Sequence, residues 1–131
     1  MKNIFILAFC LFIGNALIAQ TNSNYDKRLL SKYSEEQIEE LLTEHAQVIA
    51  YWEYYLDNAY TIVDIPMEKE IEFEGIIDFK NPATFNILES GAEMHRTTSK
   101  FYEIKSDKTK MLVVYSGDMI TRKFNQMYHN N

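Results

Sequence analysis

The chain has 131 residues, of which 47% are hydrophobic and 14% aromatic, and this composition predicts a packed interior rather than a disordered chain. Its formal net charge is −6, which opposes contact with nucleic-acid phosphates and with anionic lipid. We therefore expect a small acidic globular protein whose partners include neither nucleic acid nor a membrane surface.

Residues 1–19 have the pattern of a secretory signal peptide. A positive charge at Lys2 precedes an unbroken apolar run over residues 4–13, and small residues lie near the end of the segment. That run is about half the length of a membrane span, which requires roughly 20 residues, so we expect no span after cleavage. Cleavage is expected after Ala19, although Ala16 offers the better pattern of small residues. The predicted location is therefore periplasmic or extracellular.

Cys10 is the single cysteine of the chain, and cleavage after Ala19 would remove it. The residue before it is Phe9, whereas a lipid-modification motif has a small residue at that place, so a soluble mature chain is expected rather than a lipid-anchored one. Without cysteine, the mature protein would form no disulfide and no zinc–thiolate site. Its stability must then come from a packed core, for which a chain of this size is long enough.

The next segment, residues 20–33, is expected to be a polar leader ending in a short helical turn, with Leu29 and Leu30 as its apolar anchor. A capping box follows at residues 34–37, because the Ser34 hydroxyl and the Gln37 side chain can each bond the backbone of the other. This motif predicts that a helix begins directly after Ser34.

The predicted helix is long and amphipathic, and it extends from residue 35 to residue 56 or 58. Acidic and polar residues fall mostly on the opposite side of this helix. Its stripe at helical spacing, apolar except for the histidine, consists of Ile38, Leu41, Leu42, His45, Val48, Ile49, Trp52, Tyr55 and Leu56.

Beyond this helix the pattern changes to that of β-strands. Residues 59–65 are rich in β-branched side chains. Residues 71–74 alternate between apolar and acidic in a strand that can continue past Gly75 to residue 79, and residues 84–88 form a possible short strand. Residues 100–105 and 110–115 flank a four-residue loop and predict a hairpin. The second hairpin strand has almost no polar alternation, which is typical of a central strand covered on both faces.

A last helix is predicted after Ser116, with apolar residues at helical spacing at Ile120, Phe124 and Met127. The predicted fold is therefore a single α+β domain over residues 34–131. In it, one long amphipathic helix packs on a small antiparallel sheet, and a short C-terminal helix follows.

Two histidines are the candidates for chemistry. His45 lies within the helical stripe, where it is either a general base or ligand in a buried pocket, or an ordinary core histidine. His95 lies near Glu89 and Glu93 in a loop that is either a divalent-metal site or plain polar surface. His129 lies close to the end of the chain. We assign no catalytic residue, no metal and no cofactor.

Tyr51 and Tyr54 fall on the side of the predicted helix opposite its apolar residues. Tyrosine is enriched where proteins contact partners, because it combines apolar area with a hydroxyl group. These two residues are therefore candidates for partner binding. The alternative is that the leader around residues 25–30 folds back and covers them.

Three functions remain open from the sequence. The first is a non-enzymatic exported protein, a binding or accessory subunit that docks on another protein of the bacterial cell envelope. The second is a carrier of a small ligand between helix and sheet. The third is a hydrolase-type enzyme that uses His45 or His95. The speculative pocket of the carrier would be lined by His45, Trp52, Tyr55, Phe101 and Tyr115.

Overall fold

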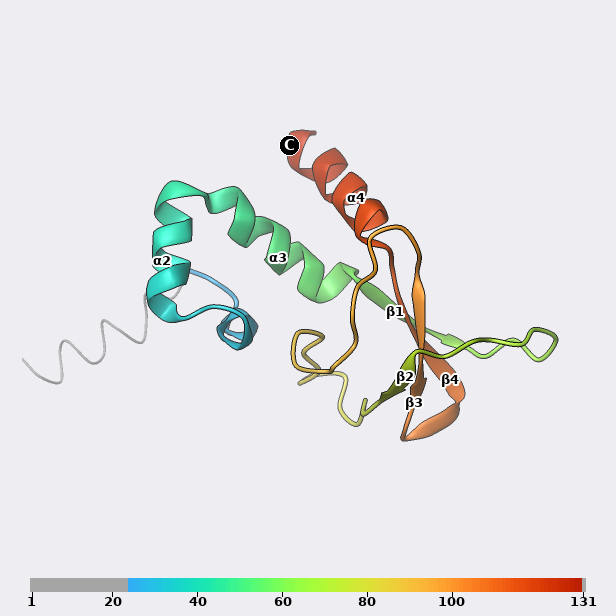
Figure 1. Ribbon diagram of the computed structural model, residues 1–131. Helices are drawn as coiled ribbons and strands as arrows, with labels where there is room; N and C mark the ends of the chain where they lie inside the picture. The colour runs from blue at the N-terminus through green and yellow to red at the C-terminus, as the bar shows by residue number, and fades with distance from the viewer. Residues whose placement is uncertain (1–23, 131) are drawn as a thin grey trace, which may run out of the picture.

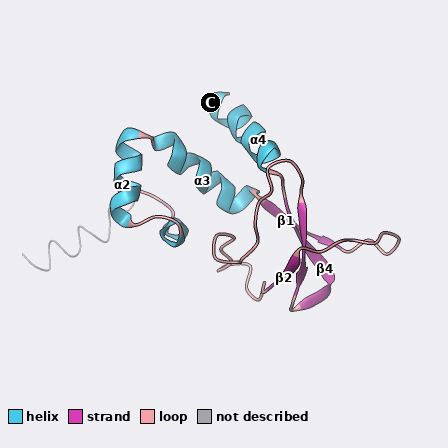
Figure 2. Ribbon diagram, viewed as in Figure 1, coloured by secondary structure: helices cyan, strands magenta, loops and turns pink. Residues whose placement is uncertain are grey.

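A computed structural model describes residues 24–130, so the predicted signal peptide, the first part of the leader and the final residue lie outside the described range. The helices and the strands occupy different parts of the molecule (Figure 1, Figure 2). In chain order the elements are η1 (Lys27–Ser31), α2 (Glu35–Glu44), α3 (Ala46–Asn58), β1 (Tyr60–Asp64), β2 (Gly75–Ile77), β3 (Lys100–Ile104), β4 (Asp107–Val114) and α4 (Gly117–His129).

The four strands form one sheet in the order β1-β4-β3-β2. β1 and β3 both pair antiparallel with the central β4, whereas β2 pairs parallel with β3. The α+β class is confirmed, but the purely antiparallel sheet is wrong because the sheet is mixed. The connection over residues 65–74 carries the chain from one edge of the sheet to the other, where β2 enters in the same direction as β1 and β3.

The predicted long helix is divided into two at His45. The capping box at its start is confirmed, since Ser34 Oγ accepts from the backbone N–H of Gln37 and the Gln37 side chain accepts from that of Ser34. His45 has φ −144° and ψ 56°, outside the helical region, so α2 ends before it and α3 begins after it. The bend turns α2 away from the line of α3, and Ile38 of α2 and Ile49 of α3 are both buried in the same core.

Two expected strands differ from the structure. Of the strand expected from residue 71 onward, only its continuation at Gly75–Ile77 forms, as β2; residues 71–74 precede it without strand pairing, although the backbone N–H of Glu74 donates to the carbonyl of Phe101 (2.8 Å). Residues 84–88 form turns, because the Asn86 side chain accepts from the backbone N–H of Leu88 and so competes with sheet pairing. The same side chain donates to the carbonyl of Arg28 and thereby ties this turn to η1.

The hairpin of β3 and β4 is confirmed, as is the central position of its second strand. Met111 and Leu112, which point to opposite faces of the sheet, are both buried. The loop is shorter than the expected four residues, because β4 already begins at Asp107. A register shift between Glu103 and Ile104 accommodates the difference.

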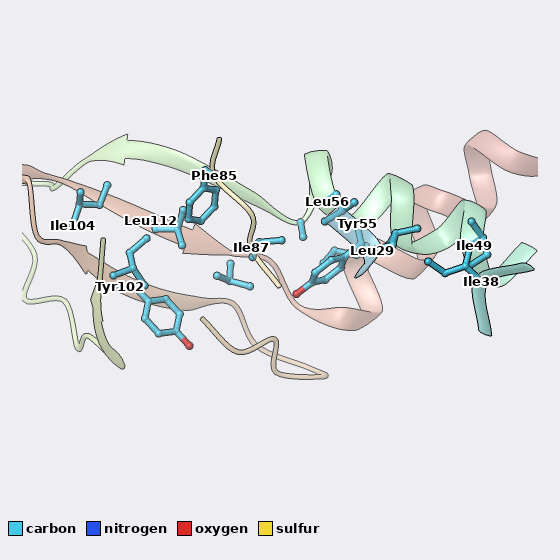
Figure 3. Packing of buried hydrophobic residues seen from close by; sticks show 14 residues of the cluster. Leu29, Ile38, Ile49, Tyr55, Leu56, Phe85, Ile87, Tyr102, Ile104 and Leu112 are labelled. Atoms are coloured by element: carbon cyan, nitrogen blue, oxygen red, sulfur yellow. The ribbon is translucent and has the colours of Figure 1, made fainter. Parts of the chain in front are cut away.

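The core is one continuous cluster that joins the inner face of the sheet to the helices (Figure 3). At its helical end, Leu29 of η1 is fully buried beside Ile38 and Ile49, whereas Leu30 is exposed. At its sheet end, Leu112 and Ile104 meet the buried turn that contains Phe85 and Ile87. The helical turn of the leader is therefore part of the packed fold, and of its two leucines only Leu29 serves as an apolar anchor.

Candidate functional site

Helix α4 leaves the sheet with its first turn firmly held. Ser116 Oγ accepts from the backbone N–H of Met119, which gives the helix a side-chain cap. The backbone N–H groups of Gly117 and Asp118 donate to the carbonyls of His95 and Arg96, both at 2.9 Å. The first turn is thus bonded to the loop before β3, while residues 125–130 at the other end are exposed.

Aromatic side chains join α4 to α3. Phe124 is buried, and its ring lies 5.4 Å from that of Tyr51 and 5.7 Å from that of Tyr54. Tyr51 in turn meets Trp52 edge to face at 5.4 Å, and Tyr128 lies 5.3 Å from Phe124 on the outer side. Such pairs stabilise a contact beyond the area that they bury. Tyr51 and Tyr54 are therefore the residues that hold α4 in place against α3.

A groove lies between the amino-terminal half of α3 and α4, and it has a volume of about 610 Å³. Its apolar wall comes from Val48, Tyr51, Trp52 and Phe124, and its rim is polar. Aromatic walls with a few polar groups at the rim are typical of binding sites for small molecules or single side chains. The other residues that line it are Glu44, His45, Ala46, Gln47, Thr121 and Asn125.

A second hollow, of about 360 Å³, lies on the other side of the bend between α2 and α3. It is lined by Tyr33, Gln37, Glu40, Leu41, Glu44 and His45. Glu44 and His45 line both hollows, so the bend separates two adjoining depressions. His45 is exposed there, and its side chain does not cap α3. The histidine expected in a buried stripe therefore lies at the surface, because the helix breaks at this residue.

Charged side chains of η1 fasten the opposite flank of α3. Arg28 pairs with Asp26 at 2.7 Å and with Asp57 at 2.9 Å, and the backbone N–H of Asp26 donates to the Glu53 carboxylate. The hydrogen bond from the Arg28 guanidinium holds the pKa of the Asp26 carboxyl below its ordinary value. Lys32 Nζ lies 4.2 Å from the centroid of the Trp52 ring. The segment around residues 25–30 thus contacts α3 at Glu53 and Asp57, whereas α4 contacts Tyr51 and Tyr54.

The five residues of the speculative carrier pocket are placed in different parts of the molecule. His45 and Trp52 line the groove. Tyr55 is 4% exposed and belongs to the core, where burial raises its pKa to about 12. Phe101 lies on the outer face of the sheet, because it alternates with the core residue Tyr102. Tyr115 follows β4, and the centroid of its ring lies 5.5 Å from Nζ of Lys123.

The loop that holds the second histidine has a structural role in the described structure. His95 is exposed, its Nδ1 lies 3.0 Å from the Thr98 hydroxyl, and its carbonyl accepts from the first residue of α4. Within residues 24–130, no three His, Cys, Asp or Glu side chains are grouped in a way that could hold a metal ion. In the same range, no helix has the combination of length and apolar character that a bilayer span requires.

Seven groove residues were not singled out as site residues by the sequence, namely Glu44, Ala46, Gln47, Val48, Thr121, Phe124 and Asn125. Val48 and Phe124 were expected only as apolar positions of their helices. The sequence did contain a signal for the contact with the last helix. Tyr51 and Tyr54 lie off the apolar stripe and therefore need another element to cover them, and the last helix has an apolar face. Its Phe124 is the residue that meets them.

This chain matches no protein-family model, no curated protein and no solved structure.

Proposed function

We propose that this is a small exported, non-enzymatic binding protein that docks on another exported protein of the bacterial cell envelope through the groove between α3 and α4. The observation that carries the proposal is the groove itself, with half-buried aromatic walls, a polar rim and a volume of about 610 Å³. A hollow of this kind accepts the side chains of a protein segment without any further chemistry. The export part of the proposal depends on the signal-peptide pattern of residues 1–19.

The rigid support of the groove agrees with this function. Its floor residue Phe124 is fixed by two tyrosines, and α4 is fixed at its first turn by two backbone hydrogen bonds. A preformed site binds without first paying the cost of ordering its own side chains. The proposed role of Tyr51 and Tyr54 is therefore to shape the binding groove from within, and Tyr51 also contributes to its wall.

Site-specific photo-crosslinking in the native cell tests the docking. A photo-crosslinking amino acid replaces Asn125, which lines the groove, and in a matched strain it replaces the neighbouring Gln126, which does not. We expect one defined exported protein to crosslink from position 125 and only weakly from position 126. Equal crosslinking from both positions, or none from 125, would contradict docking in the groove.

Protein sequencing tests the export independently. The protein recovered from the fraction outside the inner membrane should begin at Gln20, the residue that follows the expected cleavage site. Recovery of the chain with Met1 in the cytosol alone would contradict export and would leave the crosslinking result to be explained by a cytosolic partner.

A further inference from the structure

We infer that the groove receives a segment of the partner in which a lysine or arginine side chain stands next to an apolar one. This inference rests on the proposed docking function and specifies the chemistry of its partner. The apolar side chain would lie between Val48, Trp52 and Phe124, and the cation would lie at the bend, beside Glu40 and Glu44.

The first support is the negative charge that lines the bend. Among residues 24–130, Glu44 lines both hollows and Glu40 lines the smaller one, and no lysine or arginine lines either hollow. In the same range neither carboxylate forms an ion pair; the pairs present join Arg28 to Asp26 and to Asp57, or lie in the sheet and beside it. An incoming cation would therefore meet carboxylates that have no cationic partner.

The second support is the direction of helix α2. Its sequence EEQIEELLTE contains five glutamates and no basic residue, and its carboxyl end lies at the bend. The carbonyl groups at the end of a helix carry partial negative charge, which adds to that of Glu44 in the last turn. The helix end and the Glu44 carboxylate both favour a cation at this place. Their negative charge also attracts a basic partner before contact is made.

The described cations nearest to the groove do not line it. Lys32 lies over the ring of Trp52, which lines the groove, and over that of Tyr33, which lines the second hollow, but Lys32 itself lines neither. On α4, Lys123 lies near the Tyr115 ring, and Arg122 lines an adjoining hollow that shares Thr121 and Asn125 with the groove. The groove thus combines an apolar wall with an acidic end, and this arrangement selects a basic and apolar segment over an acidic or purely polar one.

The experiment measures peptide binding to the exported protein by its own fluorescence, because Trp52 is the single tryptophan and lines the groove. The probe is a helical peptide of Lys, Leu and Ala. One control peptide has Glu in place of every Lys, and a second has Ser in place of every Leu. We expect saturable binding of the first peptide, which weakens with added salt, and binding at least about tenfold weaker for each counterpart.

Matched variants locate the contact. The double substitution E40Q/E44Q should weaken binding of the Lys–Leu peptide by about fivefold, as expected for the loss of one exposed ion pair. The control E70Q/E72Q makes the same change of charge on the connection before β2, and it should leave binding unchanged. N125R places bulk and positive charge in the groove and should abolish binding, while Q126R on the same helix should not. All four variants change only exposed residues, so unaltered thermal melting confirms that each variant is folded.

Each unfavourable result has a distinct meaning. If N125R abolishes peptide binding but E40Q/E44Q has no effect, the groove docks peptides and the inferred cation is wrong. If the Lys–Leu peptide fails to bind at all, the inference fails, while crosslinking from position 125 still decides the docking function. If the free protein self-associates and N125R prevents this, the occupant is a second copy of the chain, and the inferred class of partner is overturned.

Discussion

The two halves of helix α3 have similar apolar residues but different surroundings. In the carboxyl-terminal half, Tyr55 and Leu56 are 4% and 0% exposed, because they belong to the core cluster, with Ile87 of the buried turn beside them (Figure 3). In the amino-terminal half, Ile49 is buried in the same cluster, but Val48 and Trp52 are only half-buried and line an open groove. The difference shows that the side chains of the carboxyl-terminal half are covered by the core, whereas one flank of the amino-terminal half is left open. The surface available for binding therefore lies near the bend.

A pair of truncations on this one helix should separate the two halves most clearly. Leu56→Ala removes a fully buried side chain and should lower the free energy of unfolding by about 2–5 kcal/mol. Val48→Ala removes a half-exposed side chain in the groove and should lower it by about 1 kcal/mol or less. Urea denaturation measures both. Equal losses at the two positions would show that the groove end is packed as tightly as the core.

Alkaline pH should act on the closed half through Tyr55, whose pKa burial raises to about 12. In the unfolded chain the tyrosine ionises near pH 10, so the unfolded state gains free energy from ionisation before the folded state does. The contribution of Tyr55 to stability is therefore complete below about pH 10 and is lost as the pH rises to about 12. Denaturation at several pH values across this range measures how steeply the free energy of unfolding falls with pH. Tyr55→Phe should make this fall shallower, and an unchanged fall would show that other groups cause the alkaline loss of stability.

Loss of the cap on α2 should have the smallest effect, since this helix stands at the open end of the molecule. Ser34→Ala removes the acceptor for the backbone N–H of Gln37 and should cost about 1 kcal/mol in unfolding free energy. Ser34→Asp keeps an acceptor at the same place and should stay within about 0.5 kcal/mol of the original protein. If both variants lose the same stability, the hydroxyl bond is not the cause.

Patterns of local origin were predictable from the sequence. The capping box at Ser34, the hairpin of β3 and β4, the central place of β4 and the start of α4 all follow from short-range hydrogen bonding or from the period of apolar residues. Tyr51 and Tyr54 were identified as residues off the apolar stripe, and both do lie against another element. The apolar face of the last helix made α4 one candidate for this element, but the sequence pattern does not give the angle at which a helix leaves a sheet, so the contact of α4 with α3 was not predicted.

The bend at His45 is the feature that sequence patterns missed and on which the candidate site depends. Neither glycine nor proline marks it, and the helical spacing continues through it without interruption. At the bend α2 turns away from the line of α3 (Figure 1), and Leu29, Ile38 and Ile49 are buried in one cluster (Figure 3). The position of β2 beside β3 has a similar origin, since it depends on where the connection from β1 crosses the sheet.

The sequence by itself determined the α+β class, most of the helices and strands, and the acidic character of α2, because these depend on neighbouring residues and on composition. The tertiary structure alone decided the break of the long helix, the mixed sheet and the meeting of α3 with α4. Each of these results from burying apolar side chains that are far apart in the chain, and the free energy of such contacts overrides the local preference of a continuous helix.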